Sequence, residues 1–280
     1  MGEVMSELPL YVVDAFTGVR FRGNPASVCL VETEIPEATM QAIAAEMKHS
    51  ETAFTLSLEG APTLGTRFSL RWFTPVLEVP LCGHATLATA AVILHELANP
   101  AHTIHFETKS GRLSARREGA RIALDFPAAN PRPAMVAPAV CAALGARDVK
   151  GASYAREDRN LLLELGSESE VRDLAPDFTQ LRAARGEEGF LGVIVTAGSS
   201  GEFDFVSRYF APWLGIDEDP VTGTAHCVLT PYWARLTGKR EMRAYQASRR
   251  GGEMTVRLKG DRVELVGEAV IVVAGTLRLN

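Results

Sequence analysis

The stretches RWFTPVLEVPLCGHAT (residues 71–86) and RYFAPWLGIDEDPVTGTAH (residues 208–226) decide the fold, because they are two versions of one pattern. Each runs through Arg, an aromatic residue, Phe, a small residue, Pro, any residue and Leu, and each then reaches a Gly that opens an apolar helix. The offset is 137 residues between the arginines and 140 between the glycines, so the second copy has three more residues in its loop. The pattern predicts an internal duplication.

The order of the predicted elements repeats with the motif. Apolar residues that alternate with polar ones predict strands, and apolar residues at i, i+3, i+4 and i+7 predict an amphipathic helix. The first half is predicted to hold two strands, a helix, two strands, an apolar helix and three strands: 10–16, 26–31, 37–48, 54–58, 68–72, 83–97, 103–108, 112–117 and 121–126. The second half is predicted to hold a strand, a short helix, two strands and an apolar helix before several closing strands: 161–165, 177–184, 191–197, 203–210, 223–236 and onward to 277.

The two apolar helices determine the predicted architecture. A helix without a polar face is stable only when it is covered on every side. We therefore expect an α+β protein of two pseudo-symmetric domains, each an antiparallel barrel-like sheet wrapped around a central helix. The expected domains are residues 1–127 and 128–280, and the final strand, 270–280, is the segment that can return to the first domain.

Composition and charge narrow the function classes. The 280 residues are 46% hydrophobic and 22% charged and contain no biased tract, which excludes disordered and fibrous proteins. The net charge of −5 favours neither a nucleic-acid nor a membrane partner. Four cysteines are too few for a disulfide scaffold, and the first ten residues carry acids where a secretory signal has a basic region. We expect a reduced, cytoplasmic protein.

The start of each apolar helix is a candidate anion-binding site. The first turn of a helix has backbone N–H groups without partners and about half a positive charge, so it binds carboxylates. Two facing copies would form a cleft with two such ends. That cleft would suit a small acidic molecule whose deprotonated form needs stabilisation.

Three residues of the first half are candidates for chemistry there. Glu51 follows the amphipathic helix and has the apolar neighbours Ala53 and Phe54, so a raised pKa would suit a proton carrier; the alternative is an exposed carboxylate at a loop end. His84 opens the first apolar helix, where a neutral ring is favoured; the alternative is a capping or core histidine. Cys82 at that position is either a base or nucleophile with a lowered pKa or a small buried residue.

The second copy offers an acidic run and two threonines. Of the three acids at 217–219, the last of which, Asp219, precedes Pro220, we expect one to aim at the cleft and the other two to be solvated. Thr222 and Thr224 bracket Gly223, and either caps the helix or binds a substrate carboxylate.

Neither a metal nor a nucleotide cofactor is expected. A zinc site made of Cys82, His84, His226 and Cys227 is disfavoured, because consecutive helical residues diverge by about 100°. The sequence contains no Gly-rich motif of the kind that binds dinucleotides or nucleotide phosphates.

Four motifs in order, DAFTGVRFRGNPASV (14–28), HSETAF (49–54), LRWFTPVLEVPLCGHATLATA (70–90) and DEDPVTGTAH (217–226), resemble the phenazine-biosynthesis PhzF-like family of the diaminopimelate epimerase fold. The resemblance spans most of the chain. It implies two pseudo-symmetric domains with the site between them, a homodimer, and a cofactor-free isomerase that moves a proton along a carboxylate-activated substrate.

The resemblance also assigns roles to individual residues. It implies that Glu51, His84 and Asp219 are catalytic, with Glu51 as the acid/base, and that the substrate-binding residues are Asn24, Cys82, Gly83, Gly223 and Thr224. Serine is more usual in the family where this chain has Thr224, and the added methyl group would narrow the pocket.

Two alternatives stay open beside this reading. The first is an amino-acid racemase or epimerase that uses Cys82 and Glu51 as opposing bases. A true two-thiol epimerase is disfavoured, because Thr222 stands where the second thiol would be and its hydroxyl is too weak an acid. The second alternative is a non-catalytic member that binds a metabolite or a protein. The sequence does not identify the substrate.

Overall fold

The computed structural model describes residues 7–157, 159–185 and 189–279. The chain divides into two compact units, one formed by the residues up to Asp125 together with those from Val266 onward, and the other by Phe126–Leu265. The extreme N-terminus, on which part of the cytoplasmic expectation rests, lies outside the described residues. Across the part of the chain that the structure describes, no helix combines the length and the apolarity needed to cross a membrane.

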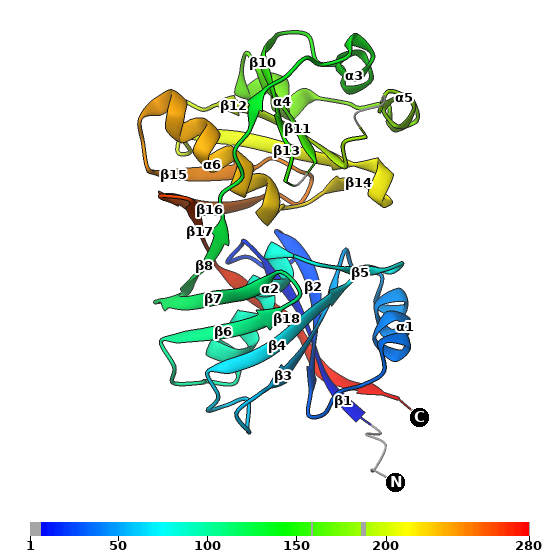
Figure 1. Cartoon of the computed structure of the whole chain (residues 1–280), viewed down its shortest axis with the longest axis vertical. Helices are drawn as coiled ribbons and strands as arrows, with labels where there is room; N and C mark the ends of the chain where they lie inside the picture. The colour runs from blue at the N-terminus through cyan, green and yellow to red at the C-terminus, as the bar shows by residue number, and fades with distance from the viewer. Residues whose placement is uncertain (1–6, 158, 186–188, 280) are drawn as a thin grey trace. The chain divides into compact units, whose positions relative to one another are not determined.

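The first unit is a sheet around a buried helix (Figure 1). Its central helix, α2, is covered by strands of the same unit, including β1, β2, β3 and β18. A π-helical turn, η1, continues α2, and α1 packs against β3 and β4. The elements are β1 (Glu7–Ala15), β2 (Asn24–Val31), α1 (Glu37–Met47), β3 (Thr52–Ser57), β4 (Arg67–Phe73), β5 (Glu78–Val79), α2 (Gly83–Ala91), η1 (Val92–Glu96), β6 (Thr103–Thr108), β7 (Gly111–Glu118), β8 (Arg121–Pro127) and β18 (Ala269–Arg278).

The second unit repeats this order around α6 (Figure 1). Its elements are β9 (Arg132–Pro133), α3 (Pro138–Leu144), β10 (Val149–Ala155), β11 (Asn160–Leu165), α4 (Glu168–Asp173), α5 (Phe178–Ala183), β12 (Gly192–Gly198), β13 (Phe205–Ala211), the 3-10 turn η2 (Pro212–Leu214), β14 (Ile216–Asp219), α6 (Gly223–Thr237), β15 (Glu241–Gln246), β16 (Gly252–Lys259) and β17 (Arg262–Gly267). The α-helices and strands without a counterpart among the predicted ones are α3, α4 and β10, together with the short strands β5, β9 and β14.

Strand pairing is the same in the two units. The pairs β1–β2, β3–β4, β4–β5 and β6–β7 are antiparallel, as are their counterparts β10–β11, β12–β13, β13–β14 and β15–β16. The pairs β2–β3 and β4–β6 are parallel, as are β11–β12 and β13–β15. The α+β class is confirmed, but the expected purely antiparallel sheets are mixed, because a helix between two strands returns the chain to the same end of the sheet.

The repeated sequence motif forms the same ion pair in both units. Arg71 on β4 contacts both carboxylate oxygens of Glu78, each at 2.8 Å, and its guanidinium lies 5.2 Å from the centre of the Phe73 ring. Arg208 on β13 contacts both oxygens of Glu218, at 2.7 and 2.9 Å, and lies 4.9 Å from the Phe210 ring. Each arginine therefore fastens its strand to the short strand that leads toward the buried helix.

The buried helices satisfy their own polar groups. Every residue of α2 is buried, and the hydroxyls of Thr86 and Thr89 donate to the backbone carbonyls of Cys82 and Ala85 at 2.5 and 2.7 Å. In α6, Pro231 has no N–H for the carbonyl of Cys227, and the N–H of Ala129 donates to that carbonyl instead, at 3.1 Å. Both helices can therefore lie inside a sheet without a polar face.

Candidate active site

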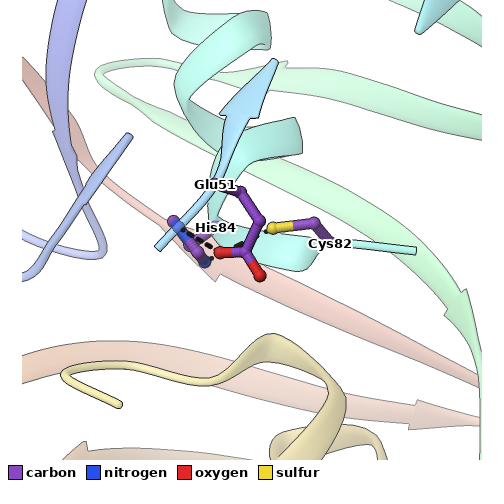
Figure 2. A group of neighbouring side chains, drawn as sticks. All are labelled: Glu51, Cys82 and His84. Carbon is purple, nitrogen blue, oxygen red and sulfur yellow. Dashed lines mark hydrogen bonds and ion pairs between the residues drawn. The ribbon is translucent and has the colours of Figure 1, made fainter. Parts of the chain in front are cut away.

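Three candidate residues of the first unit lie together at the start of α2 (Figure 2). Glu51 directly precedes β3, Cys82 is the N-cap residue of α2, and His84 is the second residue of that helix. The Nε2 atom of His84 lies 3.3 Å from Oε2 of Glu51, and its Nδ1 atom lies 3.5 Å from Sγ of Cys82. The imidazole ring therefore stands between a carboxylate and a thiol.

Burial keeps this imidazole neutral. His84 is 4% exposed, and burial, together with the nearby charge of His49, lowers its pKa from 6.5 to about 3. The expected neutral ring is confirmed, although the principal cause is burial, whereas the sequence analysis relied on the helix N-terminus. At neutral pH His84 thus has one N–H and one lone pair, and it holds no spare proton to give away.

The contact between His84 and Glu51 accommodates one proton. The Nε2 atom is buried and, among the described residues, makes no hydrogen bond of good geometry, although Oε2 of Glu51 is 3.3 Å away. Either an Nε2–H faces an ionised carboxylate, or an Nε2 lone pair faces a protonated one. Because two facing lone pairs would repel each other, the protonation states of the two groups are coupled.

The first turn of α2 supplies N–H donors beside this carboxylate. No side-chain hydrogen bond caps the helix, and the first backbone N–H groups of an α-helix have no partner within it. The side chain of Glu51 is 15% exposed, so the carboxylate is partly open to solvent. A base, a neutral imidazole and uncapped helix donors therefore lie together.

Strand β2 adds residues to the surroundings of Glu51. The parallel register of β2 and β3 sets Ser27 opposite Thr52, the residue after Glu51, and Ser27 Oγ lies 2.7 Å from Nδ1 of His49. Asn24, expected to bind substrate, is buried at the start of the same strand. Neither Ser27 nor His49 was predicted as a site residue, although each lies in one of the quoted family motifs, Ser27 in DAFTGVRFRGNPASV and His49 in HSETAF.

The candidate residues of the second unit form a cluster at the start of α6. Thr222 is the N-cap residue, but its hydroxyl donates to Oδ2 of Asp219 at 2.5 Å and makes no capping bond. The amide of Gln246 donates to the Asp219 carbonyl at 2.8 Å and to Oγ1 of Thr222 at 3.1 Å, and it accepts the N–H of Thr222 at 2.9 Å. Gln246 therefore fixes the loop that carries the aspartate, a role the sequence analysis did not assign.

The other predicted residues near the start of α6 differ in burial and in their contacts. Gly223 begins α6, and Thr224, which follows it, is half-buried. Asp219, the acid of the run to which the family resemblance assigns a catalytic role, is buried. The expectation that two of the three acids are solvated is wrong, because Arg208 holds the Glu218 carboxylate. Asp217 is the exposed acid of the three, and it pairs with Arg182 at 2.5 Å.

Comparisons with known proteins agree with these motifs. A family model described as "Phenazine biosynthesis-like protein" matches residues 13–275. The chain belongs to the phenazine biosynthesis-like family. A relative from Halalkalibacterium halodurans, named an uncharacterized isomerase, is 45% identical over 280 residues, covering 98% of this chain and all of that protein. A crystal structure of a PhzF family protein from Enterococcus faecalis has a TM-score of 0.89 and 42% identity, covering 98% of this chain and all of the other.

A structure of much lower sequence identity is similar to this chain in fold only. A hydroxyproline epimerase from Agrobacterium vitis has a TM-score of 0.59 at 12% identity, and the match covers 98% of this chain and 93% of that one. The predicted fold, shared by phenazine biosynthesis-like proteins and epimerases, is therefore confirmed. Family membership and these neighbours support an isomerase.

Proposed function

We propose that this phenazine biosynthesis-like protein is a cofactor-free isomerase that moves a proton on a small carboxylated substrate, cyclic or aromatic in character, by acid/base catalysis. The observation that carries the proposal is the position of Glu51, whose carboxylate lies 3.3 Å from a buried neutral imidazole at the uncapped start of α2. Glu51 is the carboxylate of this cluster, and a carboxylate can both take up and return a proton.

The reaction that fits this geometry has two steps. The ionised carboxylate of Glu51 removes a proton from a substrate carbon, and the electron pair of the broken C–H bond moves into the adjoining carboxylate-activated system. The resulting carboxylic acid then returns the proton to a different carbon, which restores the ionised carboxylate. Negative charge that develops on the substrate is stabilised by the N–H groups of Gly83 and His84 in the first turn of α2.

A neutral His84 has a specific place in this scheme. With its pKa near 3 it does not act as a cationic acid in the neutral pH range. It orients the Glu51 carboxylate and shares one proton with it. A single carboxylate then carries the proton in both directions, which suits a shift between two carbons on one face of the substrate.

Further residues are assigned on the resemblance of their motifs together with their positions. Asp219, held by Thr222 and Gln246, is proposed as the second catalytic group of the reaction. The proposed substrate-binding residues are Asn24, Cys82, Gly83, Gly223 and Thr224.

The experiment is deuterium exchange in heavy water with a panel of cyclic and aromatic carboxylic acids, followed by mass spectrometry. The wild-type protein is expected to exchange a carbon-bound proton of one of these acids. Glu51→Gln is expected to reduce that exchange by at least about 100-fold, the range for loss of a general base. Glu46→Gln, on the exposed face of α1, is the matched control and should exchange normally.

Two outcomes would contradict the proposal. Undiminished exchange in a folded Glu51→Gln variant would exclude Glu51 as the base. No exchange with any acid in the panel would favour a non-catalytic member that binds a metabolite or a protein.

A racemase remains the second candidate because of the contact between Cys82 and His84. The sulfur of Cys82 lies 3.5 Å from a ring nitrogen of His84, and its thiolate would be a second base beside Glu51. Cys82 and Glu51 would then serve as opposing bases on an amino acid. Deuterium at an α-carbon, with exchange lost in Cys82→Ala, would support this function over the leading one.

We further propose a cytoplasmic homodimer. No disulfide joins the four cysteines, all of which lie in the described part of the chain, and this fits a reduced compartment. The dimer rests on family resemblance, and light scattering checks it against the monomer mass of 30.2 kDa.

A further inference from the structure

The cluster at the start of α2 also has the composition of a metal site. A carboxylate oxygen of Glu51, the sulfur of Cys82 and a ring nitrogen of His84 all lie within 4.8 Å of one another. We propose that these three residues bind a thiophilic divalent cation, with zinc as the matching ion, and that the bound cation blocks the proton transfer proposed for Glu51. The second half of this inference rests on the proposed function, and the first half stands independently of it.

The donor set is the one that zinc prefers. Zinc binds cysteine sulfur at about 2.3 Å, histidine nitrogen at about 2.0 Å and carboxylate oxygen at about 2.1 Å, in a tetrahedron. Neighbouring donors in such a site are therefore about 3.4 to 3.6 Å apart. The separations of 3.5 Å between Cys82 and His84, and of 3.3 Å between His84 and Glu51, are already close to that spacing.

One adjustment is needed for a cation to bind. The two short contacts use different nitrogens of the same ring, whereas a cation takes only one of them. The other two donor pairs, each within 4.8 Å, must then close by up to about 1.3 Å to reach the tetrahedral spacing. Glu51 precedes its strand, its side chain is flexible and it is 15% exposed, so it can supply this movement while the helix holds the other two ligands.

Three protein ligands leave a fourth coordination position open. An open position is the arrangement of zinc sites that also bind water or a substrate oxygen. Binding breaks the S–H bond of Cys82 and forms a zinc–sulfur bond, and the released proton passes to the buffer. A carboxylate that coordinates the cation cannot accept a proton from a substrate carbon. The cation and the turnover of substrate therefore exclude each other.

The earlier expectation against a metal concerned a different set of residues. It rejected a site that combined Cys82 and His84 with His226 and Cys227, because the latter two diverge on one helix. The fold instead brings Glu51 to Cys82 and His84 from a loop that ends 31 residues before the cysteine. No spacing motif in the sequence predicts that approach.

The principal test is a titration of the metal-free protein with Cd²⁺, whose bond to a thiolate gives an ultraviolet charge-transfer band. The wild-type protein is expected to develop the band to one equivalent, and added Zn²⁺ should abolish it. Cys82→Ser should lose the band. Cys141→Ser is the matched control and should keep it, because Cys141, unlike the three buried cysteines, is partly exposed and so is accessible to Cd²⁺ without being part of the site.

The two remaining ligands are tested by calorimetry with Zn²⁺ in buffers of different ionisation enthalpy. Glu51→Gln and His84→Gln are expected to weaken zinc binding by at least about tenfold, and Glu46→Gln should leave it unchanged. Proton release should accompany binding to the wild-type protein. If His84→Gln fails to fold, Glu51→Gln still decides whether the carboxylate is a ligand.

The outcomes separate this inference from the proposed function, because neither readout requires turnover. A band that persists in Cys82→Ser, a zinc affinity that is unchanged in Glu51→Gln, or no band at saturating Cd²⁺ would overturn the site. If the site binds but Zn²⁺ leaves deuterium exchange undiminished, the claim of mutual exclusion is overturned. Exchange that Zn²⁺ stops and a chelator restores would support both halves.

Discussion

Acidification from pH 7 to pH 5 should destabilise the second unit through one buried histidine, His226 on α6. Its Nδ1 atom lies 2.8 Å from the carbonyl of Thr222, so the ring donates one hydrogen bond there. The other ring nitrogen, Nε2, is buried and has no hydrogen-bond partner among the described residues. Protonation would place a charged N–H at a position where no acceptor is present, and burial accordingly lowers the pKa of His226 from 6.5 to about 4.

The sign and size of the effect follow from linkage. The unfolded chain takes up a proton near pH 6.5, while the folded protein does so only near pH 4, so the unfolded state binds more protons between these values. The contribution to the free energy of unfolding is fully present above pH 6.5 and is lost as the pH falls toward 4. Between pH 7 and pH 5 the loss is about 2 kcal/mol for this histidine.

The variant His226→Thr isolates this contribution. Thr86, at the matching position of α2, donates its hydroxyl to the Cys82 carbonyl, so a threonine can keep the corresponding bond in α6 without titrating. Urea unfolding of both proteins at pH 7 and pH 5 gives the four free energies required. Tryptophan fluorescence suits the assay, because Trp213 and Trp233 lie in the second unit.

For each protein, the quantity to compare is the decrease in the free energy of unfolding from pH 7 to pH 5. The smaller threonine side chain also lowers the stability of the variant, but it does so equally at both pH values. The wild-type loss should exceed the variant's loss by about 2 kcal/mol. His102→Thr, which changes an exposed histidine, should behave like the wild type. Equal losses in wild type and His226→Thr would refute the account of a buried neutral ring.

Two further predictions concern the second unit. Gln246→Leu removes the hydrogen-bond partners of the Asp219 carbonyl and of the Thr222 N–H and hydroxyl. We expect the free energy of unfolding, measured in urea, to fall by about 2 to 4 kcal/mol and deuterium exchange to be at least about tenfold slower. A normal exchange rate would show that the loop does not need this amide. Arg208→Lys loses the bidentate contact with Glu218 and should lower the free energy of unfolding by about 3 kcal/mol. Arg71 is more exposed, so Arg71→Lys should lower it by about 1 kcal/mol or less. Equal losses for the two variants, measured by thermal unfolding, would contradict the reasoning from burial.

The parts of the fold that could be predicted are those with strong local patterns. The period-2 strands and the two apolar helices needed only the spacing of apolar residues, and β6 begins and ends at the predicted residues, Thr103 and Thr108. The missed elements have weak patterns. Strand β10, VKGASYA, mixes lysine, glycine and serine into a strand, and α4 is six mostly polar residues whose start depends on the Ser167 cap.

Long-range partners are what the sequence could not supply. Alternation of apolar residues is the same in parallel and antiparallel strands, so the pattern did not indicate the parallel pairs. Glu218 sits in an acidic run that resembles a solvated loop, yet the neighbouring strand presents Arg208 to it. Gln246 was not predicted for the same reason. It lies at the end of a strand, 24 residues after Thr222, and contacts the start of α6 only in the folded chain.

The candidate site was predictable where one motif held the residues and unpredictable where two motifs met. Cys82 and His84 are two residues apart at a helix start, so their proximity follows from the motif itself. The approach of Glu51 depends on β3 entering the sheet beside β2, which sets HSETAF next to the residues that follow Asn24. Family resemblance indicated the role of Glu51, whereas its proximity to His84 and Cys82 became known only from the structure.

The arginine–glutamate pair that recurs in both units determines where the chain tolerates a change of length. The three additional residues of the second copy all lie between Arg208 and Glu218, inside the loop that the ion pair closes. From Glu78 to Gly83, and from Glu218 to Gly223, the spacing is five positions in both copies. An insertion between the arginine and the glutamate therefore lengthens only the loop that the ion pair closes, and it leaves the spacing from the glutamate to the helix start unchanged. Changes of loop length at this place are the ones that we expect to leave the reactive groups undisturbed.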